Sequence, residues 1–168
     1  LGIMNGTSMD GVDFCLAEID LSDSYDFNFK IIREKYIPFD KDEKVMIKDA
    51  LNNLGKYNEL LDDYLGEYYY DKIKKYFLYE KIDIVSVHGQ TISHNSGKYS
   101  IQVGSPKYIH RRLKLPVFYN FRKKDIDAGG CGAPLMPFLD WLLFKNMRCN
   151  TLALNIGGIA NICYIPKN

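Results

Sequence analysis

A turn rich in glycine and hydroxyl side chains, placed between two apolar runs, is the feature that most constrains the fold. Residues 1–4 read LGIM, residues 5–13 read NGTSMDGVD, and residues 14–19 read FCLAEI. Two short strand-like runs separated by Gly, Ser, Thr and Asp are typical of a β-hairpin. The start of the chain therefore predicts a hairpin whose turn carries many hydrogen-bonding groups.

This turn contains the residue types that bind an anion. Gly6 and Gly11 let the backbone approach a ligand closely, and the hydroxyls of Thr7 and Ser8 can donate hydrogen bonds to anionic oxygens. Successive backbone N–H groups in such a turn form an anion-binding concavity. A nucleotide phosphate tail suits these groups, and an ordinary solvated hairpin is the alternative.

Two carboxylates follow in the same segment. Asp10 and Asp13 lie where they could reach a metal ion that is bound to phosphates. Mg²⁺ in nucleotide sites is bound through one or two carboxylates together with phosphate oxygens and water. The pair therefore predicts a Mg²⁺ site, with either residue binding the ion directly or through water.

A second glycine turn lies near the other end of the chain. Residues 151–165 read TLALNIGGIANICYI, which places Gly157 and Gly158 between two apolar runs. Two such hairpins in one chain resemble the way in which actin-like proteins and sugar kinases bind ATP, with the phosphates between two similar halves. The resemblance implies that Gly157 and Gly158 contact the phosphates from the side opposite the first turn.

Three further motifs lie between the hairpins. They are residues 88–91 (HGQT), 101–104 (IQVG) and 120–135 (NFRKKDIDAGGCGAPL). In this order, and with the two hairpins, they closely resemble the anhydro-N-acetylmuramic acid kinase family. That family phosphorylates a cell-wall sugar recovered during peptidoglycan recycling. The resemblance covers nearly the whole chain.

Three positions depart from the pattern that this family leads us to expect. Asn5 stands in place of Ser, Asn120 in place of Asp, and Cys131 in place of Gln. The first two are exchanges between small polar residues. The change at Cys131 removes an amide that can both donate and accept a hydrogen bond, which could loosen a contact to the sugar.

The resemblance implies a fold class and a division into domains. Residues 1–150 are expected to form an α/β, ribonuclease-H-like half-domain of the actin and sugar-kinase type, with a mixed sheet flanked by helices. Residues 151–168 would be the first hairpin of a second domain. The chain would then correspond to the N-terminal half of a longer kinase.

The implied activity is an ATP-dependent conversion of 1,6-anhydro-N-acetylmuramic acid and water to N-acetylmuramic acid 6-phosphate. Its partners would be ATP, Mg²⁺ and the sugar, and the resemblance leaves a homodimer open. Gly6, Thr7, Ser8 and Gly11 would contact the phosphates. The rival interpretation is a non-catalytic remnant or sugar-binding module of the same fold, because half of an ATP site cannot turn over.

Asp125 is the candidate catalytic residue. It follows Arg122, Lys123 and Lys124 and precedes a glycine-rich turn. By residue type alone, a surface ion pair worth about 0–1 kcal/mol is the simpler interpretation. The resemblance reverses this preference, because Asp125 matches the catalytic aspartate of the family. Its carboxylate would remove a proton from the water that attacks the anomeric carbon.

The other candidate site residues are polar groups suited to a sugar. His88, Gln90 and Thr91 follow a β-branched run and could bind hydroxyl and acetamido groups. Arg122 could clamp a phosphoryl oxygen or the lactyl carboxylate of the sugar, or it could orient Asp125. Gly130 lies in the turn that follows Asp125 and is assigned to the sugar side of the site.

Composition excludes several classes of protein. The formal net charge is +1, so the sequence offers no electrostatic argument for binding nucleic acid or an anionic membrane. No apolar run approaches the ~20 residues that a membrane-spanning helix needs. The four cysteines show neither zinc nor redox spacing, which favours free thiols in a reducing cytoplasm.

The hydrophobic pattern predicts alternating strands and helices. A β-branched run at residues 82–87 is expected to be a buried parallel strand that ends where the HGQT motif begins. Asp40 and Glu43 predict a helix N-terminus with a capping box, and Gly55 its end. Strands are predicted at residues 1–4, 12–20, 28–38, 82–87, 100–103 and 116–119, and helices at 41–54, 58–79, 106–113 and 133–147.

Overall fold

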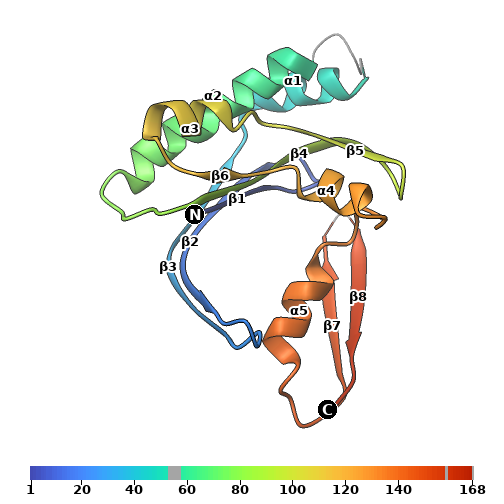
Figure 1. Cartoon of the computed structure of the whole chain (residues 1–168). Helices are drawn as coiled ribbons and strands as arrows, with labels where there is room; N and C mark the ends of the chain where they lie inside the picture. Colours follow the sequence, from blue (N-terminus) through green and yellow to red (C-terminus); the bar gives the residue numbers. More distant parts are fainter. Residues whose placement is uncertain (53–57, 158, 168) are drawn as a thin grey trace.

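The computed structural model describes residues 1–52, 58–157 and 159–167 (Figure 1). The strands are β1 (Gly2–Asn5), β2 (Gly11–Leu21), β3 (Phe27–Pro38), β4 (Val85–Asn95), β5 (Tyr99–Val103), β6 (Val117–Phe118), β7 (Thr151–Ile156) and β8 (Ala160–Ile165). The helices are α1 (Lys41–Asn52), α2 (Asn58–Phe77), α3 (Lys107–Leu113), α4 (Phe121–Asp127) and α5 (Met136–Phe144).

The main sheet has six strands and is mixed. Its order is β3-β2-β1-β4-β5, and β6 pairs with β4 outside this path. Strands β1, β2 and β3 form an antiparallel meander, whereas β4 runs parallel to β1 and β6 and antiparallel to β5. The predicted meander and the predicted mixed α/β sheet flanked by helices are both confirmed.

The hydrophobic core lies between one face of this sheet and the helices α1, α2 and α3, which cover that face (Figure 1). Alternate residues of β2 point into it, because successive side chains of a strand face opposite sides. Phe14 of β2 stacks on Phe77 of α2 with ring centroids 6.0 Å apart. The tyrosine-rich helix predicted at residues 58–79 is confirmed as a packing element, since Tyr68 and Tyr69 are buried.

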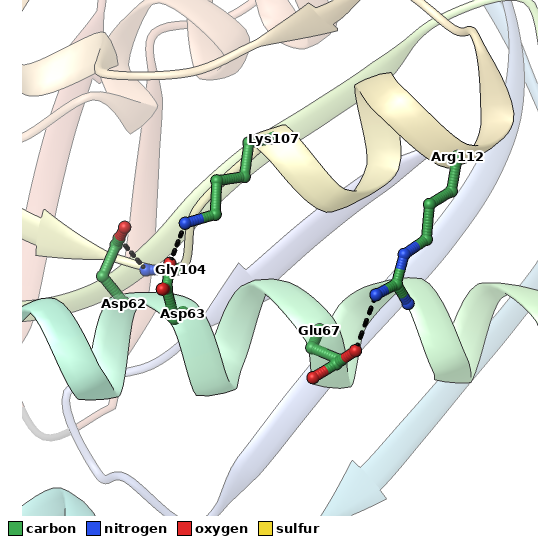
Figure 2. Close-up of polar contacts among 6 residues, drawn as sticks. All are labelled: Asp62, Asp63, Glu67, Gly104, Lys107 and Arg112. Atoms are coloured by element: carbon green, nitrogen blue, oxygen red, sulfur yellow. Dashed lines mark hydrogen bonds and ion pairs between the residues drawn. The ribbon is translucent and has the colours of Figure 1, made fainter.

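Polar contacts fix α3 and the preceding turn to α2, as Figure 2 shows. The backbone N–H of Gly104 donates to Asp62 Oδ1 at 2.8 Å, and Arg112 Nη2 donates to Glu67 Oε1 at 2.8 Å. A third contact pairs Lys107 with Asp63. Together they place the end of β5 firmly beside α2.

Helix α1 begins as the sequence predicts. The backbone N–H of Asp40 donates to Glu43 Oε2 at 2.7 Å, and the backbone N–H of Glu43 donates to Asp40 Oδ1 at 2.8 Å. This reciprocal pair is the predicted capping box. The predicted helix end at Gly55 lies outside the described residues.

Two predictions for the middle of the chain are wrong: the end of one strand and the absence of a helix. The strand expected to end at residue 87 continues as β4 to Asn95, so the HGQT motif lies within a strand. The pairing with β1 shifts register between Val87 and Gly89, and Gly89 has a φ of +75°, which allows β4 to leave β1 and pair with β5. Residues 121–127, for which no helix was predicted, form α4.

The second hairpin forms a separate two-stranded sheet, β7–β8. Helix α5 packs against β8, and its Phe138 and Trp141 contact Tyr25 in the β2–β3 turn with ring centroids 6.1 Å and 5.6 Å away. The helix is shorter than the predicted span of residues 133–147. Within the described part of the chain, no helix is both long and apolar enough to cross a membrane.

Candidate functional site

The Asp125 carboxylate is held by the loop that follows its own helix. We call residues 128–132 the Asp125 loop. The backbone N–H of Gly132 donates to Asp125 Oδ2 at 2.7 Å, and that of Gly130 donates to the Asp125 carbonyl at 2.8 Å. Asp125 is nevertheless exposed to solvent, so its carboxylate is both oriented and accessible.

The glycines of this loop are required by its shape. An ideal Cβ on Gly130 would lie 2.5 Å from Asp125 Cγ and 2.6 Å from Oδ1, closer than real side chains approach. Gly129 and Gly132 have φ values of +92° and +76°, a region that favours glycine. Asp125 therefore directly contacts the glycine-rich turn that follows it in the sequence.

Arg122 lies one helical turn before Asp125 on α4 and joins this loop to β4. Its Nη1 donates to the Gly132 carbonyl oxygen at 2.8 Å, and its Nε donates to His88 Nε2 at 2.9 Å. The same residue, Gly132, thus contacts both Arg122 and Asp125. Partial burial lowers the pKa of the Arg122 guanidinium.

His88 lies within β4 and is half-buried. Its Nδ1 is 2.8 Å from the Gly89 carbonyl oxygen, so both ring nitrogens have protein partners. Burial lowers the pKa of His88 below its usual 6.5, the hydrogen bond to Gly89 opposes this shift, and the positive charge of Arg122 adds to it. These effects favour the neutral form of the ring.

Gln90 and Thr91 connect β4 to neighbouring segments. Gln90 is fully buried, and its Nε2 donates to the Gly6 carbonyl oxygen at 3.2 Å. Thr91 Oγ1 accepts a hydrogen bond from Gln102 Nε2 at 3.3 Å. The structure thus links the HGQT motif to the first glycine turn, a connection that residues so far apart in sequence do not reveal.

The first glycine turn is exposed at its centre. Thr7 and Ser8 are exposed, and Ser8 Oγ donates to Asp10 Oδ1 at 2.8 Å. The backbone N–H of Met9 donates to the Gly6 carbonyl oxygen at 3.3 Å, and Met9 has a φ of +54°. The turn is therefore folded back on itself, with its hydroxyl-bearing residues at the surface.

Gly11 is buried and is required by packing against β3. An ideal Cβ would lie 2.5 Å from the Ile37 carbonyl oxygen and 2.7 Å from the ring of Tyr36. Tyr36 is opposite Asp13 in the strand register. Burial, and then the charges of Asp10 and Asp13, raise the pKa of the Tyr36 hydroxyl. Tyr36 belongs to none of the sequence motifs, because only strand pairing brings it to this turn.

Asp10 and Asp13 have the donor chemistry that Mg²⁺ prefers. Both residues are exposed, but partial desolvation of the Asp13 carboxylate, and then the charge of Asp10, raise the pKa of Asp13. No group of three or more metal-binding side chains occurs among the described residues. Two carboxylates fit Mg²⁺ nonetheless, since in phosphate sites the ion takes its other ligands from phosphate and water.

The end of β7 and the start of β8 lie beneath α4 in the view of Figure 1. The backbone N–H of Gly157 donates to the Ile159 carbonyl oxygen at 3.2 Å, and Gly157 is exposed. Gly158 lies outside the described residues, so its predicted phosphate contact stays a prediction.

A pocket of about 400 Å³ lies next to His88, where β4 and β5 approach the first turns of α3 and α4. Gly104 forms part of its wall, and an ideal Cβ there would lie 2.5 Å from the ring of Tyr69. Its polar lining includes side chains that were not among the predicted site residues, although Gln102 and Asn120 belong to the motifs quoted above: Asp62, Gln102, Ser105, Lys107, Tyr119 and Asn120. Burial raises the pKa of Asp62, against the effect of its hydrogen bonds to Gly104 and Ser105.

A mixed sheet flanked by helices, with a glycine turn between its first two strands, defines a domain of the sugar-kinase and actin-like fold class. The family model for anhydro-N-acetylmuramic acid kinase matches residues 1–168, and the chain belongs to this family.

Curated relatives carry the same name. Anhydro-N-acetylmuramic acid kinase of Sulfurimonas denitrificans is 36% identical over 182 residues, which cover 99% of this chain and 47% of the relative. The enzyme of that name from Bacillus cereus strain Q1 is 36% identical over 180 residues, with the same coverage. The Bacillus anthracis enzyme from strain CDC 684 is 35% identical over 180 residues. The chain spans about half the length of the curated relatives it matches.

Proposed function

We propose that this chain provides the phosphate turn and the catalytic base of an ATP-dependent kinase. The reaction converts 1,6-anhydro-N-acetylmuramic acid and water to N-acetylmuramic acid 6-phosphate in peptidoglycan recycling, in the cytoplasm. The single observation that carries the proposal is the accessible Asp125 carboxylate, which is held by the Gly132 N–H at 2.7 Å. A base oriented by the backbone needs no side-chain movement before it accepts a proton.

The chemistry requires one base. Water attacks the anomeric carbon and gives its proton to Asp125, while the bond from that carbon to the 6-oxygen breaks and its electron pair stays on oxygen. The 6-oxygen then bonds to the γ-phosphorus of ATP, and ADP leaves. Glycoside cleavage usually also needs a general acid for the departing oxygen. Here phosphorus captures that oxygen, so a second carboxylic acid is not required.

The phosphate end of the site is assigned to the first glycine turn. Gly6, Thr7 and Ser8 would contact phosphate oxygens, and Gly11 would keep the turn close to β3. Asp10 and Asp13 would hold Mg²⁺, which neutralises charge on the transferred group. Gly157 and Gly158 would contact the phosphates from the second domain, which we take to begin at residue 151.

The sugar end is assigned to the surroundings of Asp125. Gly130 and Arg122 flank the carboxylate, and the pocket beside His88 has polar groups for hydroxyl and acetamido substituents. Thr91 and Gln90 lie further along β4. Because Gln90 is fully buried, we infer that it supports the phosphate turn through Gly6 and contributes indirectly.

The isolated chain is expected to show no kinase turnover, because it spans about half the length of its relatives. The measurement is ADP release with ATP, Mg²⁺ and the anhydro sugar. As a positive control, this chain can be fused to the part of the Bacillus cereus relative that the chain does not match, so that the fusion has the length of the relative. The fusion should form the 6-phosphate, and ¹⁸O from labelled water should not enter the phosphoryl group. Robust turnover by the isolated chain, or an inactive but folded fusion, would contradict the proposal.

Thr7→Ala or Asp10→Ala in the active fusion is expected to weaken use of ATP more than binding of the sugar. Both residues belong to the phosphate turn, and Ser8 donates to Asp10. Loss of one ligand group typically costs about 1.5–3 kcal/mol, or about 10–100-fold in affinity. Separate titrations of ATP and sugar measure the effect, and Asp23→Ala in the exposed β2–β3 turn is the matched control. A defect confined to the sugar would remove this turn from the phosphate site.

A further inference from the structure

Arg122 has two neutral partners in the part of the chain that the structure describes. Its Nε donates to His88 and its Nη1 donates to the Gly132 carbonyl oxygen, while none of the ion pairs among residues 1–52, 58–157 and 159–167 includes it. A half-buried guanidinium usually has a carboxylate partner, because its charge loses hydration on burial. The hydrogen bonds of Arg122 to His88 and Gly132 therefore have a role other than neutralising a carboxylate.

The two contacts of Arg122 determine the protonation state of His88. A guanidinium has only N–H donors, so His88 Nε2 must accept and cannot carry a proton. The proton of the neutral ring is then on Nδ1, where it is donated to the Gly89 carbonyl oxygen at 2.8 Å. Protonation of Nε2 would break the 2.9 Å contact and place two cations together.

The same guanidinium reaches the Asp125 loop. Gly132 accepts from Arg122 through its carbonyl oxygen and donates to Asp125 Oδ2 through its N–H, and it is buried. A continuous path therefore runs from β4 through His88, Arg122 and Gly132 to the carboxylate. We propose that Arg122 is a positioning residue that locks His88 as the Nδ1–H tautomer and, through Gly132, orients the Asp125 carboxylate. The role of this hydrogen-bond network in catalysis rests on the proposed function, whereas the hydrogen bonds from His88 through Arg122 and Gly132 to Asp125 do not.

Other charged groups near His88 do not replace Arg122 in this role. Asp62 and Lys107 line the same pocket as His88. Asp62 accepts from Gly104, and Lys107 pairs with Asp63 on α2. The partner of the His88 ring nitrogen Nε2 is Arg122.

A sample of the chain that carries ¹⁵N-labelled histidine tests the tautomer of His88, and it needs neither a ligand nor a variant. Two-bond ¹H–¹⁵N spectra recorded over a pH series should show His88 with a protonated Nδ1, an unprotonated Nε2 and a pKa below that of free histidine. A neutral His88 that carries its proton on Nε2 would overturn the proposal by itself.

Arg122→Met tests whether Arg122 connects His88 to Gly132. The pKa of His88 should rise, because a cation next to the ring is removed, and hydrogen exchange of the Gly132 amide should become about tenfold faster. Lys123→Met is the matched control, since Lys123 is the next residue on α4 and pairs with exposed Asp127 at 2.8 Å. Both readouts should keep their wild-type values in the control. A folded Arg122→Met chain with unchanged His88 and Gly132 signals would overturn the proposal.

His88→Gln and His88→Leu separate positioning from simple packing. The amide oxygen of glutamine can accept a hydrogen bond from Arg122 Nε, so the Gly132 amide should keep its slow hydrogen exchange in His88→Gln. Leucine cannot accept this bond, so in His88→Leu the exchange of the Gly132 amide should become about tenfold faster. Equal exchange in both variants would overturn the path through Arg122. None of these measurements uses sugar or ATP, so their failure would leave the kinase proposal standing, and an inactive fusion would leave the network standing.

Discussion

Asp125→Asn is expected to abolish turnover in an active kinase that contains this chain, with ATP and sugar binding retained. The amide oxygen can still accept the Gly132 N–H that is 2.7 Å from Oδ2 in the wild type, so the loop keeps its anchor. The amide cannot take a proton from water. Loss of a general base typically lowers the rate by about 10²–10⁴-fold, equivalent to roughly 3–5 kcal/mol of barrier.

Turnover, compared with the change in stability, separates this role from a structural one. Replacing a charged acceptor by a neutral one should cost about 1 kcal/mol of unfolding free energy, or a few degrees of melting temperature. Asp127→Asn on the same helix, which breaks the ion pair with Lys123, is the matched control and should keep wild-type turnover. Turnover of Asp125→Asn within about threefold of wild type would remove Asp125 from catalysis, since loss of a base costs far more.

Gly130→Ala is expected to have the second largest effect, on both stability and rate. The new methyl group would lie 2.5 Å from Asp125 Cγ, so either the loop or the carboxylate must move. Overpacking of this kind costs about 1–3 kcal/mol, and displacing a catalytic group by about 1 Å can lower the rate about 100-fold. Melting temperature and turnover together measure the two effects.

A double-mutant cycle identifies the cause of the Gly130→Ala effect. Asp125→Ala removes the carboxylate that the new methyl group would meet, so the stability cost of Gly130→Ala should fall in that background. Gly2→Ala is the matched control, because an ideal Cβ at Gly2 finds its nearest atom, the Cys15 carbonyl oxygen, at 3.7 Å. An unchanged cost in the Asp125→Ala background would show that the backbone of the loop, and not the carboxylate, excludes a side chain at Gly130.

Local patterns in the sequence predicted the elements that local interactions stabilise. The capping box of Asp40 and Glu43 forms as expected, because both partners lie within one helical turn. Several apolar positions of α2 fall at helical spacing, and Leu61, Leu65 and Ile73 among them are buried because the helix has one face toward the sheet. Both glycine hairpins were also predictable, since apolar strand, glycine turn and apolar strand are contiguous in the chain.

Residue types alone could not predict the limits of β4 or the presence of α4. The extension of β4 to Asn95 depends on β5 as a new partner after Gly89, and such pairing between strands carries no signal in either segment alone. The residues of α4 resemble a charged loop, and the contacts of Arg122 with His88 and Gly132 fix them in place. Tertiary contacts therefore overrode a weak local preference.

The sequence alone identified the family and the candidate residues, because motifs such as HGQT and the glycine-rich loop are contiguous stretches of residue types. Only the tertiary structure decided what these residues touch. It buries Gln90 against the Gly6 carbonyl oxygen, places Tyr36 over Gly11, and connects His88 to Asp125 through Arg122. The contacts of Gln90 with Gly6, of Tyr36 with Gly11 and of His88 with Arg122 join segments that are distant in the sequence, and the distances between them follow from sheet register and helix packing, which no single stretch of sequence contains.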